Sequence, residues 1–106
     1  MTFDEYQRTA RTTVMYKLEI VYPALGLAGE AGEVAEVIKR MLRDDDGYMT
    51  SDRRQLLLYE CGDVLWYLAN LCTDAGISLS EVASTNLAKL KDRKARDVIH
   101  GSGGDR

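Results

Sequence analysis

Apolar residues recur at helical spacing along most of the chain, and stretches that alternate like a β-strand are hard to find. A period of about 3.6 residues turns one face of each segment toward a core. The predicted helices run from Thr2 to residues 16–19, from Pro23 to Arg43, from residues 50–52 to Asp74, and from Ser78 to Val98. We therefore expect an all-α protein, a compact bundle of about four helices.

Start and stop signals support these limits. Thr2–Glu5 and Ser78–Glu81 each place a hydroxyl residue three positions before a glutamate, which is the capping-box pattern. Pro23 suits a first helical turn, where its missing N–H is not needed, and Gly76 suits a C-terminal stop. The pattern predicts one domain of residues 1–98, followed by a flexible tail of residues 99–106.

The composition is that of a globular domain. Of the 106 residues, 45% are hydrophobic and 29% are charged, which excludes disordered, collagen-like and membrane classes. No apolar run approaches the roughly 18 residues of a membrane span, and the N-terminus lacks the pattern of a signal peptide. We expect a cytoplasmic protein with no membrane partner.

Charge is distributed unevenly along the chain. Residues 1–88 contain 8 Lys and Arg against 14 Asp and Glu, whereas residues 89–106 contain 6 against 3. The acidic body disfavours binding to duplex nucleic acid. The basic stretch near the end suits either a solvated helix face or contact with phosphates.

The two cysteines indicate no chemistry of their own. Cys61 and Cys72 fall on the apolar side of one predicted helix, with no CxxC spacing and no second pair for zinc. Both are predicted to be buried free thiols.

Acidic residues interrupt the apolar face of the second predicted helix. At about 100° per residue, its apolar arc contains Leu27, Ala31, Val34, Val37, Ile38, Met41 and Leu42. Glu30 lies inside this arc, and Glu33 lies at its edge. A carboxylate on a core face is costly unless a partner offsets its charge.

The third predicted helix repeats the pattern. Its arc contains Leu56, Leu57, Cys61, Val64, Tyr67, Leu68, Leu71 and Cys72. Glu60 lies inside the arc, and Asp63 lies at its edge. An antiparallel hairpin would bring Glu30 and Glu33 opposite Glu60 and Asp63, so we expect four carboxylates in one site.

Four clustered carboxylates need compensation. Acids without imidazole or thiolate nearby suit a hard cation, Mg²⁺ or Mn²⁺. The simpler alternative is that Glu30 and Glu60 each pair with a buried Arg or Lys. Two matching acid pairs favour the cation.

Two further groups of residues suit a phosphorylated ligand. Asn86, Lys89 and Arg93 form one row on the fourth predicted helix, where the cations could hold phosphate oxygens and the amide a sugar or base. Tyr67 and its neighbour Trp66 adjoin the acids, and either ring could stack on a nucleobase. Each residue taken singly is also common on ordinary surfaces or in cores.

These motifs resemble those of the MazG-like all-α nucleoside triphosphate pyrophosphohydrolases. The family pattern is Glu-x-x-Glu followed, after a helix and loop, by Glu-x-x-Asp. Here Glu30–Glu33 and Glu60–Asp63 fill it, within GLAGEAGEVAE and YECGDVLWYLANL. The resemblance extends from Phe3 to Arg96 and includes the more variable row of Asn86, Lys89 and Arg93.

The resemblance implies a Mg²⁺-dependent cut between the α and β phosphates of a nucleoside triphosphate, giving a monophosphate and pyrophosphate. It implies that the four acids bind metal and that Glu30 or Glu33 accepts a proton from water. It also implies a homodimer or homotetramer with sites near subunit interfaces. The tryptophans of some deoxycytidine-triphosphate-specific relatives have no clear counterpart, so the base preference stays open.

Other functions remain open at this point. A related all-α hydrolase could act on phosphoribosyl-ATP or dUTP, and a non-catalytic oligomer could bind nucleotides without turnover. A di-iron bundle protein would also place acids on facing helices, but it normally uses Glu-x-x-His pairs. The only histidine, His100, falls in the predicted tail.

Overall fold

The fold consists of helices joined by short connections, as the sequence predicts. A computed structural model describes residues 1–96. Its helices are α1 (Phe3–Arg11), α2 (Val21–Asp44), α3 (Ser51–Asp74) and α4 (Leu79–Ala95), and there is no strand within the described range. The prediction of an all-α fold of four helices is confirmed.

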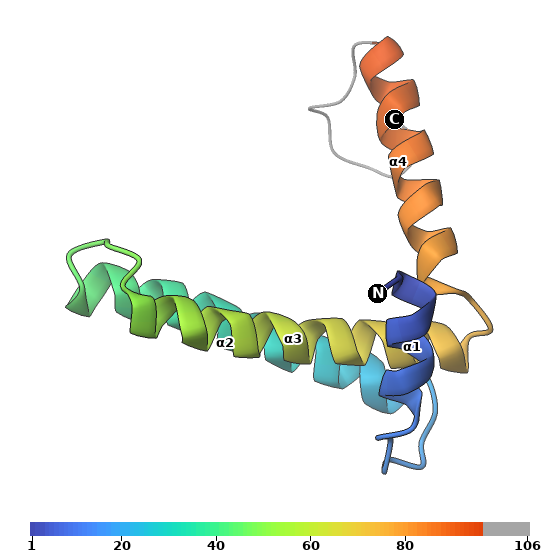
Figure 1. Ribbon diagram of the computed structural model, residues 1–106, viewed down its shortest axis with the longest axis horizontal. Helices are drawn as coiled ribbons and strands as arrows, with labels where there is room; N and C mark the ends of the chain where they lie inside the picture. Colours follow the sequence, from blue (N-terminus) through green and yellow to red (C-terminus); the bar gives the residue numbers. More distant parts are fainter. Residues whose placement is uncertain (97–106) are drawn as a thin grey trace.

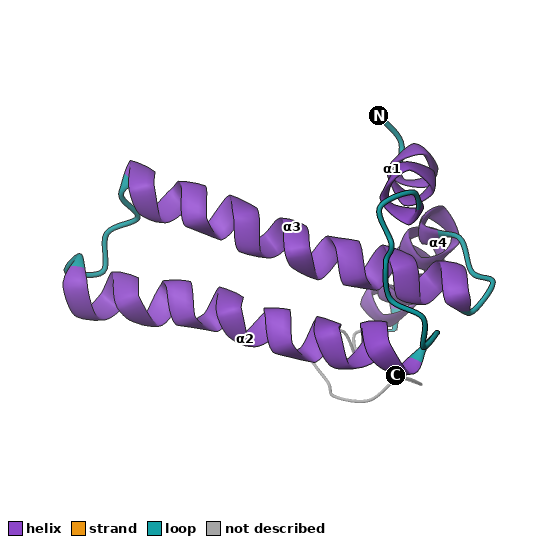
Figure 2. Ribbon diagram, turned by 90° about the horizontal axis from the view of Figure 1, so that it is seen from below, coloured by secondary structure: helices purple, strands orange, loops and turns teal. Residues whose placement is uncertain are grey.

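A long antiparallel hairpin of α2 and α3 forms the body of the molecule (Figures 1 and 2). The short helix α1 lies across the C-terminal end of α3. Helix α4 starts at the same end and points steeply away from the hairpin (Figure 1), packing against α1. None of the described helices is long and apolar enough to cross a membrane.

Helix ends follow the capping signals in most places. Thr2 and Glu5 form a complete capping box at α1, and the hydroxyl of Ser78 accepts a hydrogen bond from the Glu81 amide at α4. At α3 the hydroxyl of Thr50 accepts from the Arg53 amide. The predicted end of α4 at Val98, the tail 99–106 and His100 lie outside the described residues.

The predicted length of the first helix is wrong, because α1 ends at Arg11 rather than at residues 16–19. The hydroxyls of Thr12 and Thr13 donate hydrogen bonds back to the carbonyls of Thr9 and Ala10. These local bonds compete with continuation of the helix. Residues 12–20 instead form a linker that leads into α2.

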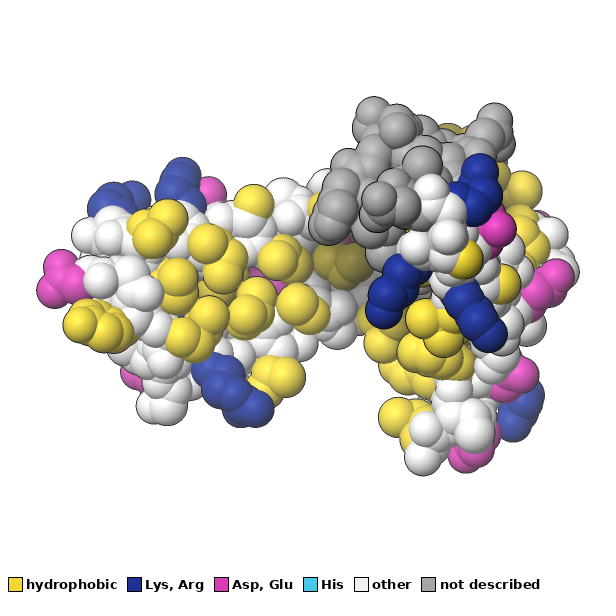
Figure 3. Space-filling view, turned by 90° about the horizontal axis from the view of Figure 1, so that it is seen from above, with side chains coloured by type: hydrophobic (Ala, Val, Ile, Leu, Met, Phe, Trp, Pro, Cys, Tyr) yellow, Lys and Arg dark blue, Asp and Glu magenta, His cyan; other side chains and the backbone are white. Residues whose placement is uncertain are grey.

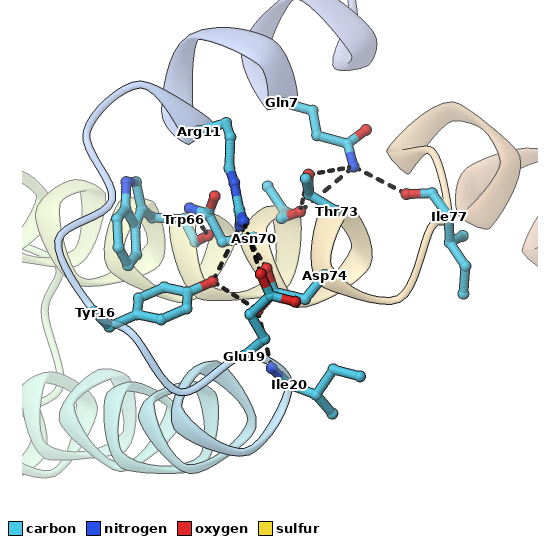
Figure 4. Close-up of polar contacts among 11 residues, drawn as sticks. Gln7, Arg11, Tyr16, Glu19, Ile20, Trp66, Asn70, Thr73, Asp74 and Ile77 are labelled. Atoms are coloured by element: carbon cyan, nitrogen blue, oxygen red, sulfur yellow. Dashed lines mark hydrogen bonds and ion pairs between the residues drawn. The ribbon is translucent and has the colours of Figure 1, made fainter.

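A buried amide connects three helices. The Gln7 amide nitrogen donates to the Thr73 hydroxyl (3.0 Å) and to the carbonyls of Ile77 (2.9 Å) and Ala69 (3.4 Å), and its oxygen accepts from the Leu79 amide (2.7 Å). Gln7 thereby fixes α1 against the end of α3 and the start of α4 (Figure 4). The main apolar cluster lies beside it and contains Ala69, Cys72 and Leu79, with Tyr6, Leu65, Leu68 and Val82 packed against them.

A second buried polar group fixes the linker. The carboxylate of Asp74 accepts hydrogen bonds from the Arg11 guanidinium, the Tyr16 hydroxyl (2.8 Å) and the Ile20 amide (2.9 Å) (Figure 4). Burial alone would raise the pKa of Asp74, but bonds from Ile20, Tyr16 and Arg11 outweigh burial and lower it. The start of α2 is thus held against the end of α3.

The chain leaves much apolar surface uncovered. Its radius of gyration is 16.4 Å, compared with about 13 Å for a compact domain of this size. Exposed large side chains include Leu25, Leu42, Leu56, Leu58, Tyr59 and Leu87. Figure 3 shows hydrophobic side chains gathered along the hairpin.

The predicted apolar arcs are therefore only partly buried. Cys72 is buried as expected, but Cys61 is exposed, so the prediction of two buried thiols is wrong for Cys61. Ala31, Leu42 and Leu56 are also exposed. Two helices packed side by side cover only the stripe along which they touch, which leaves the rest of each arc open.

We expect Gln7→Ala to destabilise the protein strongly. The substitution leaves the Leu79 amide and the Ile77 carbonyl without their buried partner, which costs roughly 2 to 4 kcal/mol. The loss is measured by chemical unfolding. Gln55→Ala, at an exposed position on α3, is the matched control and should change stability little; equal stability of the two variants would contradict the role of Gln7.

Candidate metal centre

The hairpin brings acids of α2 and α3 together. Glu30 of α2 lies opposite Glu60 and Asp63 of α3, and one carboxylate oxygen from each lies within 4.8 Å of the others. Glu60 and Asp63 are three residues apart, so both project from one side of α3. The antiparallel packing of the hairpin therefore creates the cluster.

Glu33 occupies a different place. It lies one turn beyond Glu30 on α2, is exposed, and does not belong to the group of three carboxylates. Its charge is nevertheless close enough to contribute to the raised pKa of Glu30. The structure thus brings three of the four predicted acids together and places the fourth at their margin.

The electrostatics of the cluster are unfavourable to the charged state. Burial raises the pKa of Glu30, and the charges of Asp63, Glu60 and Glu33 raise it further, as does a hydrogen bond with Glu60. Within residues 1–96 no ion pair includes any of the four acids. The described residues therefore do not support the alternative in which an Arg or a Lys neutralises each acid.

The donor set fits a hard divalent cation. Three carboxylates converge, and no histidine or cysteine of the described residues belongs to the group. Oxygen ligands of this kind suit Mg²⁺ or Mn²⁺, which retain waters that phosphate oxygens can replace. A Cβ added at Gly29, Gly32 or Gly62 would meet no atom within 4 Å, so space is open around the acid pairs.

Tyr67 lies beside the acids. It follows Asp63 by one helical turn, and its ring occupies the space that a Cβ on Gly26 would take, which explains why α2 has a glycine there. Burial raises the pKa of Tyr67, followed by a hydrogen bond and charge from Tyr22 and the charges of Glu30 and Asp63. Tyr67 therefore connects the carboxylates to the aromatic residues near the linker.

The predicted basic row lies elsewhere. Asn86 and Lys89 are exposed on α4 and line a pocket of about 440 Å³, and Arg93 is buried. Because α4 points away from the hairpin (Figure 1), a single chain does not bring this row to the carboxylates. The amphipathic pattern of α4 indicates its faces but carries no information about its direction.

Sequence reasoning missed Tyr16 and Tyr22. Tyr16 lies in the linker, which was predicted to be helical, and Tyr22 lies in the first turn of α2, before the periodic pattern begins. Both rings nevertheless join Trp66 and Tyr67 in one aromatic cluster. The only signal in the sequence for this aromatic cluster is that Tyr16 and Tyr22 lie close together along the chain.

Comparisons with known proteins agree with these features. The model of the MazG nucleotide pyrophosphohydrolase domain matches residues 22–97. The Gene 37 protein of Mycobacterium phage L5 is 44% identical over 114 aligned residues that cover 100% of both chains. No solved structure matches the chain significantly.

Glu30→Gln should stabilise the metal-free protein at neutral pH. Because the folded state raises the pKa of Glu30, it binds this proton more tightly than the unfolded state does, and stability falls as pH rises from the ordinary glutamate value through the raised one. The variant should have a higher melting temperature than the wild type at pH 7 in the presence of a chelator, and the difference should shrink at about pH 4, near the ordinary glutamate pKa. Thermal unfolding measures the difference.

Glu36→Gln is the matched control on the same helix. Glu36 pairs with Lys39 and Arg40, and the hydrogen bond from Lys39 is the largest influence that lowers its pKa. This variant should not gain stability at pH 7. A similar gain in both variants would show that the repulsion is not specific to the carboxylate cluster.

Proposed function

The chain belongs to the MazG family of nucleotide pyrophosphohydrolase domains, and we propose that it cleaves nucleoside triphosphates between the α and β phosphates, dependent on Mg²⁺. The products are a nucleoside monophosphate and pyrophosphate. The observation that carries the proposal is the convergence of Glu30, Glu60 and Asp63 without a cationic partner within the described chain. A site with uncompensated negative charge is suited to a divalent cation and, through it, to a phosphate chain.

The position of each acid suggests its role, either as a ligand of the cation or as a proton acceptor. Glu30, Glu60 and Asp63 would hold the cation, which when bound offsets charge on the phosphates and lowers the pKa of a coordinated water. Glu33 is exposed beside them, so it can accept a proton from an attacking water without being a full member of the cluster. Glu30 is the alternative base, since it is the other carboxylate that α2 brings to the site.

A second copy of the chain would supply the cationic group that the carboxylate site lacks. Lys89, which is exposed on α4, lies away from the carboxylates of its own chain, and α4 packs on α1 rather than on the hairpin. Exposed apolar side chains along the hairpin favour a homodimer or homotetramer, since a lone chain leaves them in water. In that arrangement α4 of one copy would reach the triphosphate held by another.

Substitution of the acids tests the activity. Glu33→Gln, Glu60→Gln and Asp63→Asn should each lower pyrophosphate release by about 100-fold or more, the scale expected when a group that stabilises developing charge is lost. Release is measured with Mg²⁺ on the common ribo- and deoxynucleoside triphosphates, dUTP and phosphoribosyl-ATP. Glu36→Gln, which lies outside the cluster on α2, should retain activity.

The outcome of this panel is decisive in either direction. Turnover unaffected by all three substitutions would exclude the site. Nucleotide binding without turnover on any substrate would identify a non-catalytic nucleotide-binding protein instead.

Mixing two inactive variants tests the contribution of the second copy. Asp63→Asn removes a carboxylate of the hairpin, and Lys89→Ala removes an exposed cation of α4. If these groups act from different chains, subunit exchange restores one intact site per mixed dimer, so activity should recover to about a quarter of the wild-type value. Sedimentation should give the mass of a dimer or tetramer, and a monomer, or no recovery in a mixture that exchanges subunits, would contradict this arrangement.

A further inference from the structure

The linker between α1 and α2 is held against α3 by a small number of polar contacts. The Tyr16 hydroxyl (2.8 Å) and the Ile20 amide (2.9 Å) both donate hydrogen bonds to the carboxylate of Asp74 (Figure 4). Apolar burial contributes little, because Met15 is 92% exposed and Leu18 is 61% exposed. The position of the linker therefore depends mainly on one carboxylate.

The same carboxylate positions the ring of Tyr16. This ring stacks on Tyr22 with centroids 5.1 Å apart and meets Trp66 edge to face at 6.2 Å. A second contact with the indole comes from Thr13, whose hydroxyl accepts a hydrogen bond from the Trp66 N–H (2.7 Å). The linker thus covers Trp66 with a ring and a hydroxyl, and release of Tyr16 from Asp74 would loosen this cover.

Backbone strain at Ile20 opposes the closed position of the linker. Ile20 has φ of 65°, in the left-handed region that β-branched residues rarely adopt, and its side chain is about half-exposed. The conformation is therefore imposed by the hydrogen bond from the Ile20 amide to Asp74 rather than by side-chain packing. When that bond breaks, the backbone can relax, so the strain favours an open linker.

The two helices that flank the linker are held by contacts of their own. Gln7 fixes α1 through hydrogen bonds with Thr73, Ile77 and Leu79. Helix α2 packs along α3 as part of the hairpin. Neither set of contacts includes the linker, so the linker can move away from α3 while the helices keep their places.

Movement of the linker would change the surface next to the carboxylates. The linker forms one side of a pocket of about 470 Å³, and Trp66 and Tyr67 of α3 form part of the other side. These two residues follow Asp63 by three and four positions, which is roughly 5 to 6 Å along the helix. Once the linker moves away, this side of α3 is open to water.

We propose that the linker is a lid that Asp74 holds closed: the lid opens as a unit, with the helices intact, and its opening exposes the side of α3 next to the carboxylates. Tyr16 and Ile20 are the two points at which Asp74 holds it. This inference goes beyond the proposed function, since the movement belongs to the chain without metal or nucleotide. The experiments therefore use the metal-free, full-length protein, and their results do not depend on whether it is a hydrolase.

Ile20→Asn tests the contribution of strain. Asparagine adopts left-handed conformations several times more often than most residues do, so this variant should favour the closed lid and slow hydrogen exchange of the linker amides by about fivefold. Exchange is measured by mass spectrometry and corrected for the intrinsic rates of each sequence. Leu18→Asn is the matched control, since Leu18 is exposed in the same linker and its φ is not positive; it should not slow exchange.

A weaker hold by Asp74 should have the opposite effect. Asp74→Asn removes the charge that strengthens these bonds and should speed exchange of the linker amides by about 10-fold or more, with amides in the middle of α2 and α3 unchanged. Tyr16→Phe removes a single bond and should speed it by about fivefold, which provides the measurement if Asp74→Asn does not fold. Asp52→Asn, at an exposed acid of α3, is the control.

The indole N–H of Trp66 reports whether opening uncovers α3. Trp66 is the only tryptophan of the chain, so its indole NMR signal is unambiguous, and its hydrogen bond to Thr13 breaks when the lid opens. Exchange of this N–H with water should change in step with that of the linker amides, becoming faster in Tyr16→Phe and slower in Ile20→Asn.

Three results would each overturn the inference. Equal exchange in Ile20→Asn and Leu18→Asn would show that strain at Ile20 does not favour opening. Linker and helix amides that accelerate together in Tyr16→Phe would show that opening is global unfolding. Faster exchange of the linker amides without faster exchange of the indole N–H would show that the lid does not cover Trp66.

Discussion

The buried carboxylate of Asp74 is the interaction on which the arrangement of the molecule depends. It lies in the last turn of α3, where the helix dipole disfavours negative charge, and its side chain is fully buried. Arg11, Tyr16 and the Ile20 amide compensate for both costs. Because Ile20 immediately precedes α2, this bond fixes where α2 starts along α3, and so which residues of the two helices face each other.

The Ile20 backbone illustrates how firmly this point is held. Ile20 has φ of 65°, a left-handed conformation that is unfavourable for a β-branched residue. Such a conformation costs on the order of 1 to 3 kcal/mol and persists only where surrounding contacts impose it. Here the contact is the bond from the Ile20 amide to Asp74, which turns the linker sharply into α2.

The hairpin contains two acidic centres, at Asp74 and at Glu30, and the pKa values of these two carboxyl groups shift in opposite directions. At Asp74, donors within the chain outweigh burial and lower the pKa of the carboxyl group. At Glu30, burial and three like charges raise the pKa, and no ion pair within residues 1–96 relieves them. A carboxylate satisfied by its own chain stabilises the fold, whereas a cluster of unsatisfied carboxylates supports the proposal of a bound cation.

The features that the sequence predicted are those determined by local spacing. The capping residues Thr2 and Ser78 define helix starts by accepting hydrogen bonds from amides three residues further along the chain. The acid pairs emerge because three-residue spacing keeps both members on one side of a helix. Their convergence further required only that α2 and α3 form a hairpin, which a short loop between two long helices makes natural.

What the sequence did not predict depends on contacts between distant residues. The course of the linker after α1 follows from Asp74, which lies 58 positions after Tyr16 along the chain. The exposure of Cys61 and Leu42 follows from how little of each helix the hairpin covers. The direction of α4 depends on Gln7, whose bonds to Ile77 and Leu79 orient the turn between α3 and α4.

The same bonds explain why, under the proposed function, one chain would contain only part of the nucleotide site. Gln7 turns α4 away from the hairpin, so Lys89 cannot balance the carboxylates of its own chain. Asp74 draws the linker close to α3, so Tyr16 stands beside Trp66 and Tyr67, next to those carboxylates. Each chain therefore presents acids and aromatic rings on the hairpin and cations on α4, with exposed apolar surface between them. In the proposed oligomer, association would bring the cations of one chain to the acids of another and would cover that surface.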